Sequence, residues 1–70
     1  MSTHYRVSAD ILARLHYGLP PKPATLVGHA SKGYASCLSR MRGRGFIQGL
    51  TVTREGYLYL DALLRKLRHQ

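Results

Sequence analysis

Apolar residues recur at helical spacing in three parts of the chain, and a short β-prone run separates the last two. The first helix is expected to begin after Ser8, a favourable N-cap residue, and to end at Gly18. Residues 1–7 lack this periodicity and are expected to form a short arm. The apolar face of the first helix consists of Ile11, Leu12 and Leu15.

The next segment, residues 19–23, contains three prolines. Residues 19–23 are expected to form an extended spacer, because a residue that precedes proline is driven out of the helical region. Pro23 suits the first position of a helix, so a short helix is predicted over residues 23–27. A longer helix should follow, with Ser31 as its N-cap, and should end near Gly43 because Gly45 breaks it. Its packing face is predicted to hold Tyr34, Ala35, Leu38 and Met41.

The last third of the chain predicts a hairpin and a closing helix. The run FIQGLTV, residues 46–52, contains two β-prone triplets joined around Gln48 and Gly49. Thr53 is the expected N-cap of the last helix, which should carry Glu55 in its first turn and run to Arg68. Its main apolar stripe is Tyr57, Leu60, Leu63, Leu64 and Leu67. A second apolar group, predicted to form a dimer interface, is Leu58, Tyr59 and Ala62.

Size and charge narrow the class of protein. The 70 residues are enough for one small domain, residues 1–70, and the 44% of hydrophobic residues favour a folded chain. Eleven Lys and Arg against three Asp and Glu give a formal charge of +8, which favours a polyanion or an acidic protein as partner. The single cysteine, Cys37, excludes an internal disulfide, and no run is long and apolar enough for a signal peptide or a membrane span. We therefore expect a soluble cytoplasmic protein without membrane partners.

The expected order of elements is typical of the winged helix-turn-helix, a mostly α fold with four helices and a two-stranded short wing. SCLSRMRGRGFI followed by LTVTREGYLYLDALL resembles the recognition helix, wing and last helix of winged helix regulators of the MarR-like type. The resemblance covers about residues 23–64. The small size is similar to that of minimal regulators of phages and other mobile elements. The chain departs from the family in its two-residue wing turn without a basic tip and in its short, proline-led first helix of the pair.

The resemblance implies a division of roles along the helix that follows Ser31. The residues implied to face base edges are Lys32, Gly33, Ser36 and Arg40. The residues expected along the DNA backbone are Ser31, Arg42, Arg44 and Arg54. Side-chain chemistry agrees for Arg40, whose guanidinium can form a bidentate pair with guanine. Lys32 and the two arginines at 42 and 44 are better suited to phosphate, which supplies affinity without sequence choice.

Several residues allow a second interpretation. The arginines could simply solvate a helix face, although five basic residues and no acid between Ser31 and Arg54 favour nucleic acid. Tyr34 could stack on a base, but its angular position favours the core. Cys37 lies off the predicted apolar face and is interpreted as an inert small residue rather than a redox switch.

The sequence contains no motif that is typical of a catalytic site or a metal-binding site. The four histidines, His4, His16, His29 and His69, have no metal-ligand spacing. Asp10, Glu55 and Asp61 are explained by helix ends or solvated faces, and no phosphate-binding glycine loop is present. We therefore expect no enzyme activity, no metal and no cofactor.

These patterns lead to two hypotheses. The first is a sequence-specific transcription regulator, a small repressor that binds double-stranded DNA as a homodimer. The second is a basic adaptor or inhibitor that docks on an acidic protein, such as a polymerase or nuclease subunit. The short wing and the second apolar group of the last helix favour the second hypothesis, since both suit a protein interface.

Overall fold

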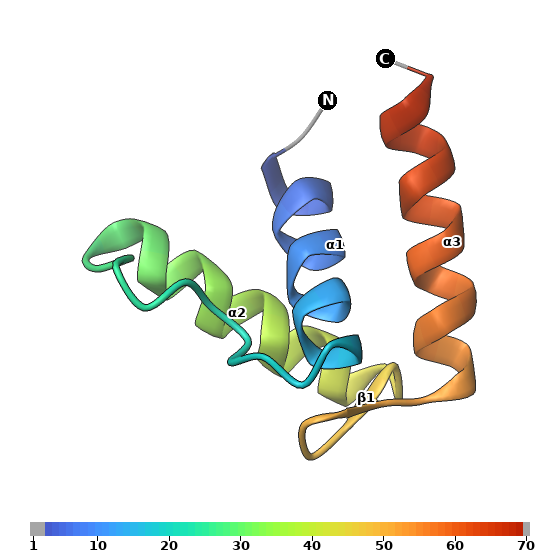
Figure 1. Ribbon diagram of the computed structural model, residues 1–70, viewed down its shortest axis with the longest axis horizontal. Coiled ribbons are helices and arrows are strands. Elements are labelled where there is room, and N and C mark those ends of the chain that lie inside the picture. The colour runs from blue at the N-terminus through green and yellow to red at the C-terminus, as the bar shows by residue number, and fades with distance from the viewer. Residues whose placement is uncertain (1–2, 70) are drawn as a thin grey trace.

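Three helices and one hairpin make up residues 3–69, the part of the chain that the computed structural model describes. In chain order the elements are α1 (Thr3–His16), α2 (His29–Gly43), β1 (Ile47–Gln48), β2 (Thr51–Val52) and α3 (Arg54–Arg68). Helices α1 and α3 pack against each other and run antiparallel, and α2 packs on α1 at a steep angle (Figure 1). The N-terminal half of α2 projects to one side of this pair, accompanied by the loop that leads into it (Figure 1).

Helix α1 begins at Thr3, so the prediction that Ser8 caps it is wrong. Ser8 lies in the middle of the helix, completely buried, and its hydroxyl has no hydrogen-bond partner. Residues 3–7 are helical rather than an arm, whereas positions 1 and 2 of the predicted arm lie outside the described residues. Tertiary packing explains this start: Tyr5 and Val7 pack on the core, and the Lys66 ammonium lies 4.8 Å from the centre of the Tyr5 ring.

The segment between α1 and α2 contains no helix, which corrects the prediction for residues 23–27 and gives three helices rather than four within residues 3–69. Gly18, at φ 73°, ends the first helical segment as predicted, because a left-handed residue is easiest for glycine. Helix α2 begins at His29 after Gly28, which offers no side-chain cap. Ser31 is therefore inside the helix and not its N-cap. The predicted end at Gly43 is confirmed.

The hairpin and the start of α3 interlock through Thr53 and Gly56. Strands β1 and β2 are antiparallel, with Ile47 opposite Val52, and the turn is one residue later than expected, at Gly49 and Leu50. Thr53 caps α3 as predicted: its Oγ1 accepts from the Gly56 amide at 3.1 Å and donates to the Gly45 carbonyl at 2.6 Å. A Cβ on Gly56 would lie 2.1 Å from the Phe46 carbonyl oxygen, so this position requires glycine.

One hydrophobic core joins all three helices to the hairpin. Its buried apolar residues are Ala9, Ile11, Leu12, Leu15, Cys37, Met41, Ile47, Val52 and Leu63. On α2 the inward positions include Cys37, whereas Ala35 is exposed, which reverses the expectation for this pair. On α3, Tyr57 and Leu64 are exposed rather than part of the packed stripe. The mostly helical fold with a two-stranded antiparallel hairpin is as predicted.

Candidate nucleic-acid interface

The outward face of α2 carries small and basic side chains. A 100° step per residue places the centre of this face opposite the inward side chains of Cys37 and Met41. The residues at its centre, all exposed, are Lys32, Ser36, Ser39 and Gly43. Gly33 and Arg40, also exposed, lie about 100° or more from this centre, on the flank of α2 next to Cys37. Gly33 also lines a hollow with Asp10 and Tyr34. Ser39 was missed in the sequence prediction, although its spacing from Ser36 and Lys32 places it on the same face.

No contact within residues 3–69 explains why exposed positions of α2 are occupied by glycine. No atom lies within 4 Å of the position that a Cβ would take on Gly33 or Gly43, so neither residue is needed for packing within the chain. Each glycine costs up to about 1 kcal/mol of helix stability relative to alanine. The two glycines leave the backbone open to close approach from outside.

Arg40 is held against the N-terminal turn of α1. Its Nη1 atom lies 2.9 Å from Nδ1 and 3.0 Å from Nε2 of His4, which in turn lies 3.3 Å from the Cys37 sulfur through Nδ1. The guanidinium can donate only to the ring nitrogen that carries no proton. Because Arg has five N–H donors, the contact leaves others available on an exposed side chain. Sequence spacing did not reveal this pair, whose members are 36 residues apart.

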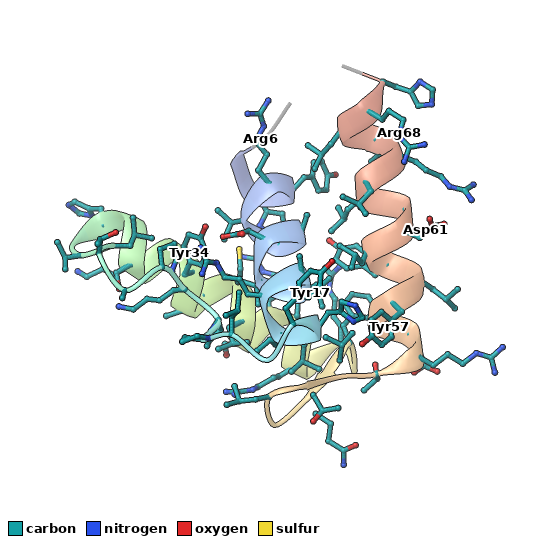
Figure 2. The ribbon with its side chains drawn as sticks, in the orientation of Figure 1. Arg6, Tyr17, Tyr34, Tyr57, Asp61 and Arg68 are labelled. Carbon is teal, nitrogen blue, oxygen red and sulfur yellow. The ribbon has the colours of Figure 1, made fainter. Side chains whose placement is uncertain are left out.

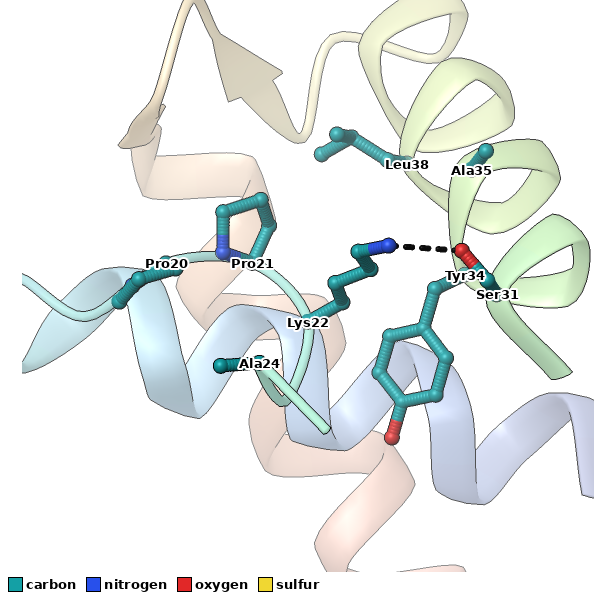
Figure 3. Close-up of a pocket in the computed structure, with 8 residues that line it drawn as sticks. All are labelled: Pro20, Pro21, Lys22, Ala24, Ser31, Tyr34, Ala35 and Leu38. Atoms are coloured by element: carbon teal, nitrogen blue, oxygen red, sulfur yellow. Dashed lines mark hydrogen bonds between the residues drawn. The ribbon is translucent and has the colours of Figure 1, made fainter. Parts of the chain in front are cut away.

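The residues expected along a DNA backbone lie in different surroundings. Arg42 donates from Nε to the Gly49 carbonyl at 2.9 Å and so braces the hairpin turn while remaining exposed. Arg44 at the end of α2 and Arg54 at the start of α3 are both exposed. Ser31 accepts a hydrogen bond from the Lys22 ammonium at 2.7 Å, which brings a further cation from the loop to α2 (Figure 3).

The hairpin is short and carries no basic residue. Its strands have two residues each, and residues 45–53 include no Lys or Arg. Gln48 and Thr51 are exposed, and Leu50 at the turn is 57% exposed. A hairpin of this size can approach the surface of another molecule, but it has no cation with which to neutralise a phosphate charge.

Tyr34 fastens α2 to α1 and is not available for stacking on a base. Its hydroxyl donates to Asp10 Oδ2 at 2.5 Å, and the same oxygen accepts from Arg14 Nε at 3.1 Å. Burial raises the pKa of the Tyr34 phenol to about 12, and the hydrogen bond to Asp10 adds to the shift. The interpretation of Tyr34 as a packing residue is therefore confirmed, whereas Asp10 is in mid-helix and not in a first turn.

Two of the three acidic residues form ion pairs within their own helices. Asp10 pairs with Arg14, and Asp61 pairs with Arg65 at 3.2 Å on α3. Glu55 is in the first turn of α3, as predicted. No Asp or Glu occurs between positions 31 and 54, so no acidic residue of that segment neutralises the basic residues of α2.

The second apolar group of α3 is only partly exposed. Leu58 is 63% exposed and Ala62 is also exposed, but Tyr59 stacks on Phe46 with ring centroids 4.4 Å apart and an interplanar angle of 14°. Tyr59 therefore belongs to the packed side of α3, which corrects its expected place beside Leu58. The exposed large apolar residues of α3 are Tyr57, Leu58 and Leu64.

Comparison of the chain with protein-family models, with curated proteins and with solved structures gives no match. Within residues 3–69, no three His, Cys, Asp or Glu side chains are grouped so that they could hold a metal ion. None of the helices in that range has the length and apolarity needed to cross a membrane. The role of the interface must therefore be inferred from its own geometry and charge.

Proposed function

We propose that this chain binds double-stranded DNA through the outward face of α2 and acts as a sequence-specific transcription regulator, a small repressor working as a homodimer. One observation carries the proposal: the exposed surface of α2 combines small residues with basic side chains, and no atom of residues 3–69 lies within 4 Å of the Cβ positions of Gly33 and Gly43. The major groove admits an α-helix, and small residues on that helix allow its backbone to approach the base edges. The surrounding cations supply attraction to phosphate.

Individual residues take roles that follow from their positions. Arg40 is the best base reader, since its exposed guanidinium can make a bidentate contact with guanine. Lys32, Gly33 and Ser36 lie on the same exposed side of α2 and complete the face toward the bases. The residues proposed for the DNA backbone are Ser31, Arg42, Arg44 and Arg54. The hairpin contributes no cation, so sequence discrimination falls on α2.

Selection of bound duplexes from a random library at two salt concentrations tests this function. Sequence-specific binding enriches a defined site at both concentrations, whereas bare electrostatic attraction enriches none and fades at high salt. If the three arginines proposed for the DNA backbone each contact one phosphate, the slope of log K against log salt is about −3. Failure to enrich any sequence would contradict specific recognition.

Arg40→Ala tests the proposed base contact on the selected site. Loss of a bidentate contact lowers specific affinity by about 5- to 150-fold, equivalent to about 1–3 kcal/mol, and affects random DNA much less. Arg68→Ala is the matched control, because Arg68 is an exposed arginine at the far end of α3 from the hairpin (Figure 2). Equal loss on both kinds of DNA would reassign Arg40 to phosphate.

A protein partner is the second candidate function. A hairpin without cations and with an exposed Leu50 at its turn suits a protein surface better than a DNA groove. In this role the chain is a basic adaptor or inhibitor on an acidic protein, such as a polymerase or nuclease subunit. A partner that stays bound after nuclease treatment, together with no duplex binding in the selection, would place this function first.

A further inference from the structure

A cavity of about 360 Å³ lies between the proline-rich loop and α2 (Figure 3). Its walls are mainly apolar and come from Pro20, Pro21, Ala24, Tyr34, Ala35 and Leu38, with Lys22 and Ser31 as the polar members. Pockets for small molecules range from about 300 to 1,000 Å³ and combine apolar walls with a few polar groups. This cavity therefore has the size and lining of a small-ligand site.

The polar groups of the cavity are arranged as an anion site. Lys22 projects from the loop, and its ammonium donates to the Ser31 hydroxyl of α2 at 2.7 Å (Figure 3). Lys22 is the one charged side chain among the eight lining residues. An ammonium has three donors, so the bond to Ser31 leaves others for a bound anion.

The remaining lining offers hydrophobic contact. The hydroxyl of Tyr34 is committed to Asp10, so only the ring of this residue is offered to the cavity. Pro20 and Pro21 restrict the backbone of one wall, which lowers the conformational entropy that binding would remove. A ligand is therefore met by an apolar wall on each side and by one cation.

We propose that this cavity binds a small apolar carboxylate, a compound with one carboxylate on an aromatic or aliphatic body. The carboxylate pairs with Lys22 and accepts from Ser31, while the body packs against Pro21 and Leu38. A cationic ligand would be repelled by Lys22, and a neutral apolar ligand would leave its ammonium without an anion. Ser31 is also one of the residues proposed for the DNA backbone, whereas Lys22 and the apolar walls are not, so ligand binding is tested in the absence of DNA.

The test uses 3-phenylpropionate and its primary amide, which differ in charge but hardly in shape, in NMR titrations of the labelled full chain. The acid is expected to shift the backbone amide signals of Lys22, Ser31, Ala35 and Leu38 first. The amide should bind about tenfold more weakly, because a charge-assisted pair is lost. Equal affinity of acid and amide would overturn the proposal, as would shifts centred outside the cavity.

Two variants and one control locate the site. Lys22→Met keeps the length of the side chain but removes its charge, and should weaken the acid about tenfold without weakening the amide. Ala35→Leu fills the cavity from an exposed helical position and should abolish the shifts from both compounds. Arg68→Met removes an exposed cation that does not line the cavity and should change neither affinity. Unchanged binding in Lys22→Met or Ala35→Leu, with a folded spectrum, would refute the site.

Discussion

The Tyr34 hydroxyl and the Asp10 carboxylate, 2.5 Å apart, join α2 to α1 across 24 positions of sequence. Arg14 donates to the same carboxylate oxygen, so one acidic side chain fixes both its own helix and its neighbour. This link lies where α2 leaves the core and projects with its loop (Figure 2). The position of the proposed DNA-reading face relative to α1 therefore depends on it.

Removing the Tyr34 hydroxyl should lower stability and change its pH dependence. Tyr34→Phe is expected to cost about 1 kcal/mol near pH 7, the usual net value of a hydrogen bond. The raised pKa means that the folded chain keeps this proton up to about pH 12, whereas the unfolded chain loses it near pH 10. The stabilisation is therefore complete below pH 10 and is lost as the pH rises to about 12. Urea unfolding at several pH values measures both effects.

The control for this experiment is Tyr17→Phe, because Tyr17 is 75% exposed and is not part of the link between Tyr34 and Asp10. That variant should follow the wild type at every pH. If Tyr34→Phe and the wild type lose stability in parallel between pH 10 and 12, the raised pKa is contradicted.

Ser8→Ala should stabilise the chain. The Ser8 hydroxyl is fully buried without a hydrogen-bond partner, and leaving such a group unsatisfied costs about 1–3 kcal/mol. Alanine also favours a helix by a few tenths of a kcal/mol. Ser39 is exposed on α2, so Ser39→Ala should gain only the helix preference of alanine. A larger increase in melting temperature for Ser8→Ala than for Ser39→Ala would therefore measure the cost of the buried hydroxyl. Equal gains would show that the hydroxyl carries no penalty.

Gly56→Ala should destabilise the chain strongly. The new methyl group would overlap the Phe46 carbonyl oxygen and press on Val52, and overpacking costs about 1–3 kcal/mol or more when backbone must move. Gly33→Ala is the opposite case, since its Cβ meets open space and the helix gains up to about 1 kcal/mol. Thermal unfolding of the two variants should shift in opposite directions. A neutral Gly56→Ala would contradict the close approach.

Leu58→Glu tests the proposed dimer. Leu58 is the most exposed large apolar residue of α3, so a charge there should separate a dimer that uses this face without affecting the monomer fold. Tyr59→Glu is unsuitable, because loss of the stack on Phe46 would disturb the core. Light scattering with circular dichroism measures mass and helicity, with Gln48→Glu as an exposed control. A monomeric wild type would remove the dimer from the proposal.

The sequence predicted a helix end correctly where that end depends on residues within one turn of it. Thr53 as N-cap, Gly18 as a left-handed stop and the end of α2 at Gly43 all agree with the structure, because each depends on backbone geometry within one turn. The start of α1 was wrong for the opposite reason. Ser8 has a strong local preference for the N-cap position, but the packing of Tyr5 and Val7 on the core overrides it.

The sequence predicted which side chains of the candidate site are exposed, but it did not predict which residues they contact. A helical period places Lys32, Gly33 and Ser36 outward, and all three are exposed. The contact of Arg40 with His4 joins residues 36 positions apart, and no period connects them. Tyr59 was misplaced for a related reason, since only the path of the hairpin brings Phe46 beneath it.

The loop before α2 is held by few backbone hydrogen bonds of its own. Within residues 20–27 the one backbone-to-backbone hydrogen bond runs from the Leu26 amide to the Pro23 carbonyl, at 3.1 Å. Amide protons that lack such bonds exchange readily, so this loop should exchange faster than the interior of α3. A partner that covers the loop should slow this exchange, whereas a partner on α3 should leave it unchanged. Hydrogen exchange can therefore tell which end of the molecule a partner occupies before any complex is crystallised.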